Sequence, residues 1–599
     1  MKTHNDAHHK TPLIGPVGWV ALLCIVLLFA ALAASINTKP YMPPAVAQKY
    51  MEHWLIESSR HVAGEVRLKH TRAIEPFYLR RDYQPVWMNS FELTPAAKEL
   101  LQVLRETAAD DWRHYGYELP ILERETNRLS NIPKQATAVE VLLTDAFVTF
   151  AKQALNAELL PDTNEADHPS IRRVNIGSTA QYVTDEHVVD ILNDAVRRDQ
   201  LDHLISQLKP THPGYLRLRN ELNRYRAIAD SGLWRELPRD MTLQPQQRHA
   251  HIPQLRWMLA QYGDLQESRV LSWLFTPQQP SWTPEQDIDE AQIDLNQADY
   301  LYDNALVLAI KRFQQRHNLT ATGEIDDVTL RLLNVTPYQM TQRIALNMKR
   351  WRHLPRELGQ RHVMVNMADY RLQLISGNTI ELDMKVIIGN EQRRTPVMVD
   401  SISTLELAPT WAVPRRIAVN SILPRVRRNP DYLEQNNYQL VANENGVERY
   451  VSSRDVDWSK MNARNFPYRI IQSAGPHNAL GGIKFIMPND QDIYLHDTSQ
   501  PQLFSLDKRA ISSGCVRVEQ PNLLAEKLLR GHQGWHRPHI DRAIEQGRTT
   551  RIRLQEDIPV YLMYWTTWVD DNGTLQIRED IYKRDLTAGM KPHNPSLAL

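Results

Sequence analysis

The sequence is poor in cysteine and has no excess of charge. Two cysteines among 599 residues are too few for a disulfide framework or a cysteine-rich zinc module. Lysine plus arginine and aspartate plus glutamate each number 70, and this zero net charge argues against a general nucleic-acid-binding protein. No His-Glu-x-x-His pattern or comparable ligand cluster occurs. We therefore expect no nucleic-acid partner, no metal and no cofactor.

A single apolar run is long enough to cross a membrane. Val17–Ala34 contains no charged residue and, as a helix, would span about 27 Å. We expect a transmembrane anchor at 17–36, a cytoplasmic tail at 1–16 and a linker at 37–60. A cleaved signal peptide and a buried core helix remain open as alternatives, the former because Ala31-Leu32-Ala33 fits a cleavage site. Both the anchor and the signal peptide would place the rest of the chain outside the cytoplasm.

The sequence between the linker and residue 337 is helical in pattern. Residues 61–250 are expected to form a helical scaffold domain, including one long helix over Val188–Leu208, and they carry no chemical motif. Residues 251–337 are expected to form a small module of three helices, because apolar residues recur at helical spacing before a Thr-Gly turn: Leu306, Ile310 and Phe313.

The remainder of the chain, residues 338–585, is mainly β in pattern. Ile380, Leu382, Met384, Val386 and Ile388 alternate strictly with other residues, as in a half-buried strand. This alternation lapses at about 405–473, which we expect to be an insertion in the sheet domain, and a short tail follows at 586–599. The fold class expected for the whole chain is therefore multidomain α+β.

The residues best suited to chemistry lie between His496 and Val518. Cys24 falls in the apolar run, so Cys515 is the one thiol outside it. His496 precedes it by nineteen residues and could take its proton, which would lower the pKa of the thiol. Gly514 could expose backbone N–H groups to a developing oxyanion. From these residues alone, a packed core cysteine is an equally good interpretation.

A serine nucleophile is a rival interpretation. Ser505-Leu506-Asp507-Lys508 matches the S-x-x-K pattern of penicillin-binding enzymes, but no K-T-G motif follows it. A pattern of two fixed letters occurs about once by chance in a chain of this length. We expect Ser505 to have no catalytic role.

Several segments together resemble the L,D-transpeptidase family, whose catalytic domain is of the YkuD type. HDT at His496 and SSGCVRV at Ser512–Val518 are similar to its catalytic motif, and GPHNALGGIKFIMP (Gly475–Pro488) is similar to the segment before the catalytic histidine. KVIIGNEQRRTPVM (Lys385–Met398) resembles its opening strand. AIKRFQQRHNLTATGEIDDVTLRLLN (Ala309–Asn334) looks like a peptidoglycan-binding module, and EPFYLRRDYQPVW (Glu75–Trp87) is similar to the scaffold of large membrane-anchored members in Gram-negative bacteria.

The resemblance implies a role for each residue of the site. Cys515 would be the nucleophile, His496 the general base and acid, and Gly514 part of the oxyanion hole. Ser513 stands where many members have histidine, and its backbone carbonyl would orient His496. The substrate-binding residues implied or considered as cleft walls are Arg517, Tyr494, Asn478, Ser512 and Trp411.

The resemblance also implies the reaction and its partners. Stem peptides and glycan strands of peptidoglycan would be bound, 3→3 cross-links between diamino acids would form through a cysteine thioester, and carbapenem-type compounds would inhibit. The 405–473 insertion would be a lid, and the protein would sit in the inner membrane with its catalytic part in the periplasm. Two alternatives stay open: a hydrolase acting as an L,D-carboxypeptidase or endopeptidase on the same thioester, and a non-catalytic wall-binding protein.

Overall fold

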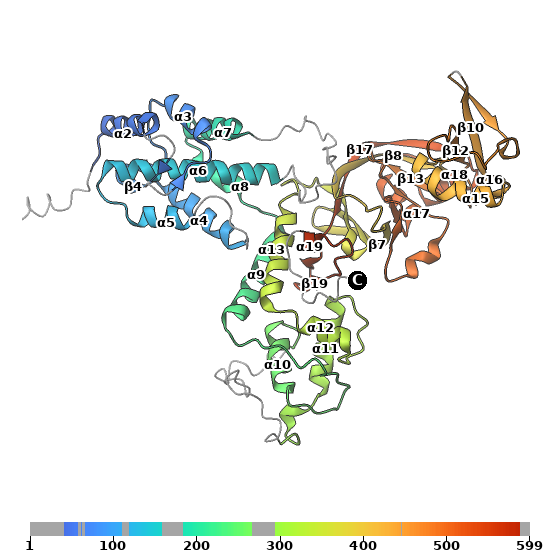
Figure 1. Ribbon diagram of the computed structural model, residues 1–599, viewed down its shortest axis with the longest axis horizontal. Helices are drawn as coiled ribbons and strands as arrows, with labels where there is room; N and C mark the ends of the chain where they lie inside the picture. Colours follow the sequence, from blue (N-terminus) through green and yellow to red (C-terminus); the bar gives the residue numbers. More distant parts are fainter. Residues whose placement is uncertain are drawn as a thin grey trace, which may run out of the picture. The chain divides into compact units, whose positions relative to one another are not determined.

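The protein is described by a computed structural model (Figure 1). The described residues are 41–57, 61–62, 66–110, 119–157, 184–265, 294–444 and 446–587. They form two compact units. The first comprises 1–105, 115–151 and 184–207 and the second comprises 106–114, 152–183 and 208–599, so far as these ranges are described. Each unit is treated by itself below.

The first unit is helical. Its helices are α2 (Pro44–Glu57), α3 (Thr71–Leu79), α4 (Pro95–Asp110), α5 (Leu119–Asn127), α6 (Pro133–Ala157), α7 (Asp185–Arg197) and α8 (Leu201–Leu208), with two short hairpins, β1 (His61–Val62) with β2 (Val66–Arg67) and β3 (Met88–Asn89) with β4 (Glu92–Leu93). The single helix expected over Val188–Leu208 is wrong, because the chain breaks at Asp199, whose φ is +56°. Aspartate tolerates this left-handed conformation better than most residues do, and it separates α7 from α8.

The second unit begins with a helical module. It contains α9 (Pro213–Asp230), α10 (Ile252–Gln261), α11 (Asn304–Arg316), α12 (Asp327–Leu333) and α13 (Pro337–Trp351). Leu306, Ile310 and Phe313 are buried on one face of α11, as the helical spacing predicts. Buried Gln314 links α11 to the turn that follows it and to α12, because its amide donates to Thr322 Oγ1 at 3.1 Å and to Thr329 Oγ1 at 3.2 Å.

The nine-stranded sheet of the second unit, which carries His496, is closed on itself. Its strands are β5 (Arg361–Asn366), β6 (Arg371–Ser376), β7 (Thr379–Gly389), β8 (Met398–Leu407), β13 (Ile483–Ile486), β14 (Leu495–His496), β15 (Ala510–Ser512), β16 (Val516–Val518) and β17 (Thr550–Met563). The order is β15-β7-β16-β14-β13-β8-β17-β5-β6, and β6 also pairs with β7. The alternating residues of β7 from Leu382 to Ile388 are buried in its core, whereas Ile380 at the strand start is 39% exposed.

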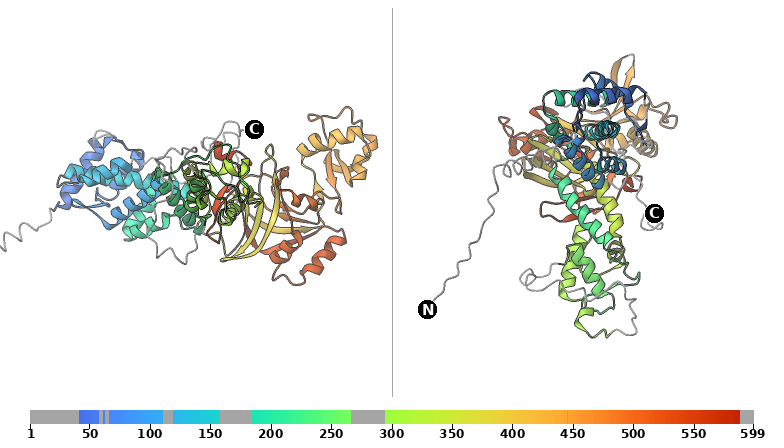
Figure 2. Two further views of the ribbon diagram at one scale, coloured as in Figure 1. Left: turned by 90° about the horizontal axis from the view of Figure 1, so that it is seen from below. Right: turned by 90° about the vertical axis from the view of Figure 1, so that its left-hand side faces the viewer.

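Residues 408–482 leave the sheet between β8 and β13 and form a small lobe (Figure 2). The lobe contains α14 (Arg415–Ile417), α15 (Leu423–Arg428), α16 (Tyr432–Gln435) and a separate sheet in the order β11 (Val447–Val451), β10 (Tyr438–Glu444), β12 (Arg469–Gln472), β9 (Trp411–Ala412). It has its own apolar core, in which Val426, Phe466 and Ile470 are almost fully buried. Leu405 and Leu407 still belong to β8, so the lobe begins a few residues later than the pattern suggested.

The C-terminal part completes the second unit. It consists of α17 (Pro521–Leu528), α18 (Arg537–Glu545), the hairpin β18 (Thr567–Val569) and β19 (Leu575–Ile577), and α19 (Arg584–Thr587). The helical N-terminal scaffold, the small helical module and the mainly-β C-terminal domain together confirm the expected α+β architecture.

The expected transmembrane helix is not found. In the described ranges no helix is both long enough and apolar enough to cross a membrane. The prediction of a single-pass inner-membrane protein is corrected by this finding. The segment on which it depended, 17–36, lies outside the described residues, as do 1–16 and most of 586–599.

Candidate active site

His496 lies in the middle of a row of charged side chains on one face of the catalytic sheet. Its strand, β14, pairs with β13 on one side and with β16 on the other, so Lys484 and Arg517 are its cross-strand partners. Paired residues share a face of a sheet, and their side chains are close enough to interact. The neighbouring pair, Leu495 and Val516, points to the opposite face and is fully buried. The strand register therefore fixes where the imidazole lies.

Cys515 comes immediately before β16. The amide of Val516 donates to the carbonyl of Tyr494 at 3.2 Å, which puts Cys515 beside Tyr494, the residue just before β14 begins. The thiol is half-buried and donates to the carbonyl of Asp492 at 3.4 Å. No hydrogen bond joins it to the imidazole among the described residues. Catalytic hydrogen bonds are often long before substrate binds, so this geometry is compatible with a thiol–imidazole pair.

The loop that carries the thiol is held by Ser512. Its hydroxyl donates to the carbonyl of Cys515 at 2.7 Å and accepts the amide of Gly514 at 3.1 Å. Gly514 has φ +125°, a conformation that residues with a side chain rarely adopt. The N–H of Gly514 is therefore already used inside the loop, whereas that of Cys515 makes no hydrogen bond in the part of the chain that is described.

A second loop, which follows β7, holds the Cys515 loop in place through hydrogen bonds. Thr395 is fully buried, and its hydroxyl donates to the carbonyl of Gly514 at 2.7 Å and accepts the amide of Gly389 at 2.9 Å. Tyr582 donates to the carbonyl of Gly389 at 2.5 Å. A Cβ at Gly389 would lie 2.0 Å from the carbonyl oxygen of Arg393, so only glycine fits there. The position of Cys515 thus depends on residues more than 100 positions earlier in the chain.

If Cys515 is the nucleophile that the resemblance implies, Gly389→Ala should reduce its acylation by about 100-fold, because the displaced loop would release Gly514 and misplace the thiol by about 1 Å. Gly573→Ala is the matched control, since a Cβ there would have no atom within 4 Å and would add only backbone strain. Acylation measured in a single turnover should separate the two variants. A normal acylation rate in the Gly389→Ala variant would show that the loop after β7 does not position the nucleophile.

Burial sets the charge states of the two central groups. Burial, and then the charge of Arg517, lower the pKa of His496 to about 3, while hydrogen bonds to the backbone of Asp497 and Leu480 act in the opposite direction. Burial raises the pKa of the Cys515 thiol, although Tyr494 and Lys484 oppose this rise. The lowered thiol pKa expected from the sequence is therefore not found. In the resting site both groups are neutral at pH 7.

The imidazole has one nitrogen available. Nδ1 of His496 is buried and has no hydrogen-bond partner among the described residues, while the backbone of Asp497 and of Leu480 contacts the ring. A ring that donates from Nε2 keeps its lone pair on Nδ1. His496 is thus arranged as a neutral base.

The low pKa of His496 also makes a prediction about stability. The imidazole is neutral in both the folded and the unfolded chain above about pH 6.5, and its contribution to stability is then complete. Between pH 6.5 and about 3 the unfolded chain takes up a proton that the folded chain does not, so stability falls. The stability difference between the wild type and His496→Gln, measured by urea unfolding, should shrink from pH 7 to pH 4. A difference that stays constant would contradict the burial argument.

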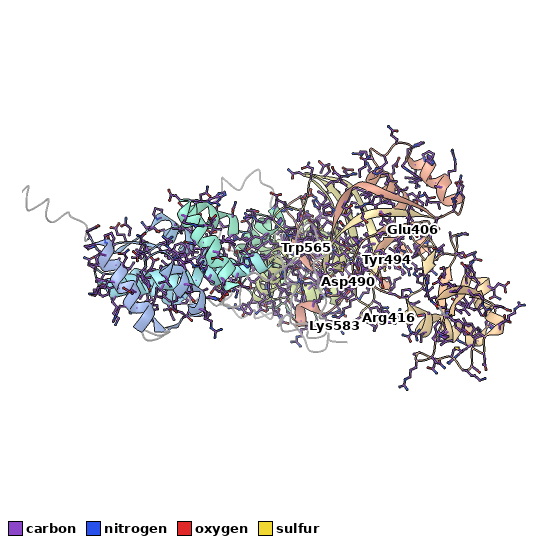
Figure 3. The ribbon with its side chains drawn as sticks, turned by 90° about the horizontal axis from the view of Figure 1, so that it is seen from above. Glu406, Arg416, Asp490, Tyr494, Trp565 and Lys583 are labelled. Atoms are coloured by element: carbon purple, nitrogen blue, oxygen red, sulfur yellow. The ribbon has the colours of Figure 1, made fainter. Side chains whose placement is uncertain are left out.

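The other residues predicted for the site do not all lie beside His496 and Cys515. Tyr494 lies against His496, with ring centroids 5.6 Å apart, and Figure 3 labels it in the same domain as Glu406. Arg517 is partly buried, its Nε has no partner, and it makes no ion pair among the described residues. Trp411 is half-buried on β9 and packs against the core of the lobe. Ser512, as described above, holds the loop.

Two predicted roles have no support in the observed contacts. Asn478 is buried and donates to the carbonyls of Pro409 and Ser473 at 3.0 and 2.9 Å, so it ties the ends of the lobe together. The hydroxyl of Ser513 accepts from Arg393 Nη1 at 2.7 Å, but the backbone that contacts the imidazole belongs to Asp497 and Leu480.

The rival serine does not form a catalytic pair. Ser505 donates to the carbonyl of Gln502 at 2.7 Å, and Lys508 is an exposed residue in an ion pair with Glu579 at 2.9 Å. A general base for Ser505 is therefore not supplied by Lys508.

Lys484 is a site residue that the sequence analysis missed. Its ammonium lies 4.0 Å from the centroid of the Tyr494 ring. The available signal was the charged residue inside the apolar run IKFIM, because a charge within such a run needs an explanation.

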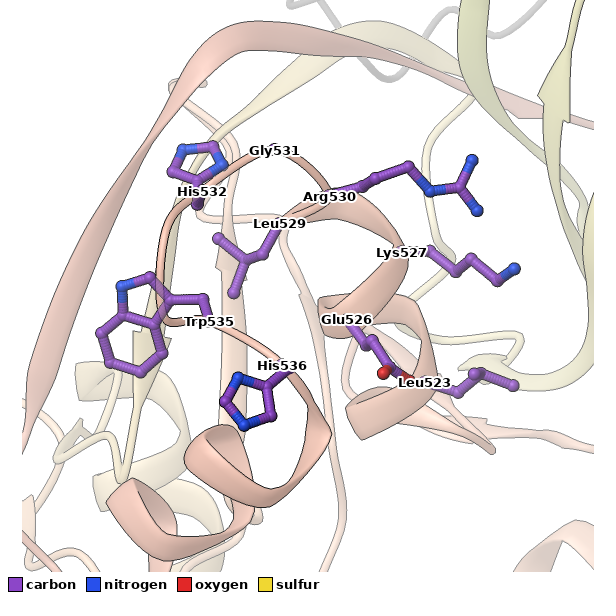
Figure 4. Close-up of a pocket in the computed structure, with 9 residues that line it drawn as sticks. All are labelled: Leu523, Glu526, Lys527, Leu529, Arg530, Gly531, His532, Trp535 and His536. Carbon is purple, nitrogen blue, oxygen red and sulfur yellow. The ribbon is translucent and has the colours of Figure 1, made fainter.

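A separate hollow of about 390 Å³ is lined by α17 and by the loop that leads from it to α18 (Figure 4). Its lining includes Trp535, His532, His536, Lys527 and Arg530, and neither Cys515 nor His496 belongs to it. No group of three or more metal-ligating side chains is found in the ranges that the structure describes.

Comparison with known proteins agrees with this organisation. Residues 72–222 match a scaffold domain, residues 284–333 match a domain described as a "Putative peptidoglycan binding domain", and residues 360–537 match the L,D-transpeptidase catalytic domain. The chain is 37% identical over 246 residues to a Haemophilus influenzae protein named "Putative L,D-transpeptidase". That alignment covers 41% of this chain and about half, 48%, of the relative.

The matched catalytic range contains β5 to β16, and therefore both His496 and Cys515. The three matches follow the divisions of the fold: residues 360–537 are similar to the L,D-transpeptidase catalytic domain of the YkuD type, and they follow one range similar to a "Putative peptidoglycan binding domain" and one similar to a scaffold domain.

Proposed function

We propose that the protein is a peptidoglycan L,D-transpeptidase that forms 3→3 cross-links through a thioester on Cys515. The proposal is supported by the strand register of β14 and β16, in which His496 and Cys515 share one face of the sheet, and by the neutral imidazole, whose Nδ1 has no hydrogen-bond partner among the described residues. This is the arrangement that general-base activation of a cysteine needs.

In the first half-reaction, Cys515 attacks the carbonyl between the diamino acid and the terminal D-alanine of a tetrapeptide stem. His496 Nδ1 takes the thiol proton and returns it to the leaving amine of D-alanine. The free N–H of Cys515 donates to the oxyanion, a contact that is typically worth about 10² to 10³ in rate. Arg517, which has no carboxylate partner in the described chain, binds a carboxylate of the donor stem.

In the second half-reaction, the side-chain amine of a second stem attacks the thioester. His496 takes a proton from this amine and returns it to the departing sulfur, so the enzyme is restored. The peptidoglycan-binding domain would hold the glycan or stem peptides near the site, and a carbapenem would acylate the same sulfur. If water replaced the amine, the product would be a tripeptide.

Incubating the full chain with purified tetrapeptide monomers tests this function. Mass spectrometry should show a cross-linked dimer and released D-alanine. A tripeptide as the sole product would identify a hydrolase instead, and unchanged tetrapeptide that remains bound would identify a non-catalytic wall-binding protein.

A further inference from the structure

The charged row in the site extends beyond the histidine. Glu406 on β8 pairs in register with Lys484, which pairs with His496, which pairs with Arg517. On the far side, Arg551 of β17 pairs with Glu406, and these two form an ion pair of 2.8 Å. Glu406 is only 4% exposed. The carboxylate nearest to Lys484 along the row is thus held by another cation.

Lys484 itself makes no ion pair within the described chain. It is half-buried, and its ammonium is directed to the ring face of Tyr494, 4.0 Å from the centroid. Tyr494 in turn is the residue beside Cys515, because its carbonyl accepts the amide of Val516. Partly burying an ammonium that has no carboxylate partner costs free energy. An anion that forms nearby would offset this cost.

Among the side chains of this neighbourhood that the structure describes, the one that becomes an anion during acyl transfer is Cys515, because its thiol must ionise to attack. We propose that Lys484 stabilises the ionised Cys515 sulfur while His496 holds the thiol proton. This inference deepens the proposed function and rests on it. Burial lowers the pKa of Lys484, whereas Glu406 and an ionised Cys515 raise it, which agrees with a favourable interaction between the ammonium and the thiolate.

The charge of Lys484 also favours transfer of the proton from His496 to the leaving amine. Burial, Arg517 and, to a smaller extent, Lys484 lower the pKa of His496, so an imidazolium formed by taking the thiol proton is a strong acid in this site. It therefore gives the proton readily to the leaving amine. In the second half-reaction Lys484 stabilises the sulfur again as it departs from the acyl group. No other reactant is required, since the proton passes from sulfur to nitrogen and then to the amine.

The test measures the acidity of the thiol without peptidoglycan. The full chain is treated with iodoacetamide at a series of pH values, and alkylation of Cys515 is followed by peptide mapping with mass spectrometry, which separates it from alkylation of Cys24. Lys484→Met keeps the length and apolar stem of the side chain, and Lys484→Arg keeps the charge. Lys508→Met removes an exposed lysine on the same domain and is the matched control.

Lys484→Met should slow alkylation at pH 7 about tenfold and move the pH profile to higher pH, because an opposite charge nearby favours the thiolate. Lys484→Arg and Lys508→Met should alkylate at nearly the wild-type rate. Other charged or titratable groups facing the thiol or the ammonium are unchanged in all variants: Asp492, Tyr494, His496, Arg517, Glu406 and Arg551.

Wild-type alkylation by a folded Lys484→Met would overturn the inference. So would a variant whose alkylation is normal but whose KM for the stem peptide rises, because Lys484 would then bind substrate. Should Lys484→Met not fold, Lys484→Gln gives the same comparison. The alkylation result is independent of whether the chain cross-links, so failure of this inference can be told apart from failure of the proposed function.

Discussion

Cys515→Ala is expected to abolish 3→3 cross-linking. Alanine cannot form a thioester, and no second free cysteine lies in the described chain to replace it. Purified tetrapeptide monomers incubated with the variant should give no dimer by mass spectrometry of the muropeptides. The variant should fold normally, because the contacts of residue 515 that hold the loop involve its backbone carbonyl, which alanine retains.

Ser505→Ala is the matched control for the nucleophile. Its hydroxyl contacts the carbonyl of Gln502 and no other group of the described chain, so dimer formation should continue unchanged. Cross-linking that persists in Cys515→Ala but disappears in Ser505→Ala would reverse the assignment and favour the serine mechanism.

His496→Gln is expected to slow thioester formation by about 10² to 10⁴, the usual contribution of a positioned general base. Glutamine is similar in size but cannot accept a proton at neutral pH, and the Cys515 thiol, whose pKa is raised by burial, would then have to ionise without help. Single-turnover acylation with a tetrapeptide measures the effect.

His362→Gln provides the comparison for this variant. His362 is also a buried histidine of the catalytic sheet, with Nδ1 3.1 Å from the carbonyl of Gly359, but it lies on β5. Its substitution should leave the acylation rate within a few-fold of wild type. An equal loss in both variants would mean that the effect comes from damage to the sheet and not from the loss of a base.

Much of the architecture was readable from local patterns. The alternation of β7 gave a half-buried strand because the side-chain period of two is a property of the strand itself. The spacing of Leu306, Ile310 and Phe313 predicts a helix because residues three and four apart lie on one face of a helix. The break at Asp199 was missed because the apolar pattern continues across it, while a single left-handed residue redirects the chain.

The site was predictable only in part, because its geometry comes from long-range pairing. The motif identified His496 and Cys515, but the parallel pairing of β14 with β16 is what aligns their strands. Thr395 and Gly389 lie far from the motif in sequence, and their contacts with the Cys515 loop leave no local signal. Burial also reversed the expected direction of the thiol pKa, since the sequence gives the neighbours of a group but not its exposure.

The most direct test of the account is to trap the acyl-enzyme. The full chain is mixed briefly with a tetrapeptide stem and quenched in acid, and the modified residue is located by peptide mapping with mass spectrometry. We expect one added acyl group, equal in mass to the stem peptide minus D-alanine, on Cys515. An acyl group on any other residue, or dimer formation with no acyl-enzyme at all, would contradict the claim that the reaction proceeds through this sulfur.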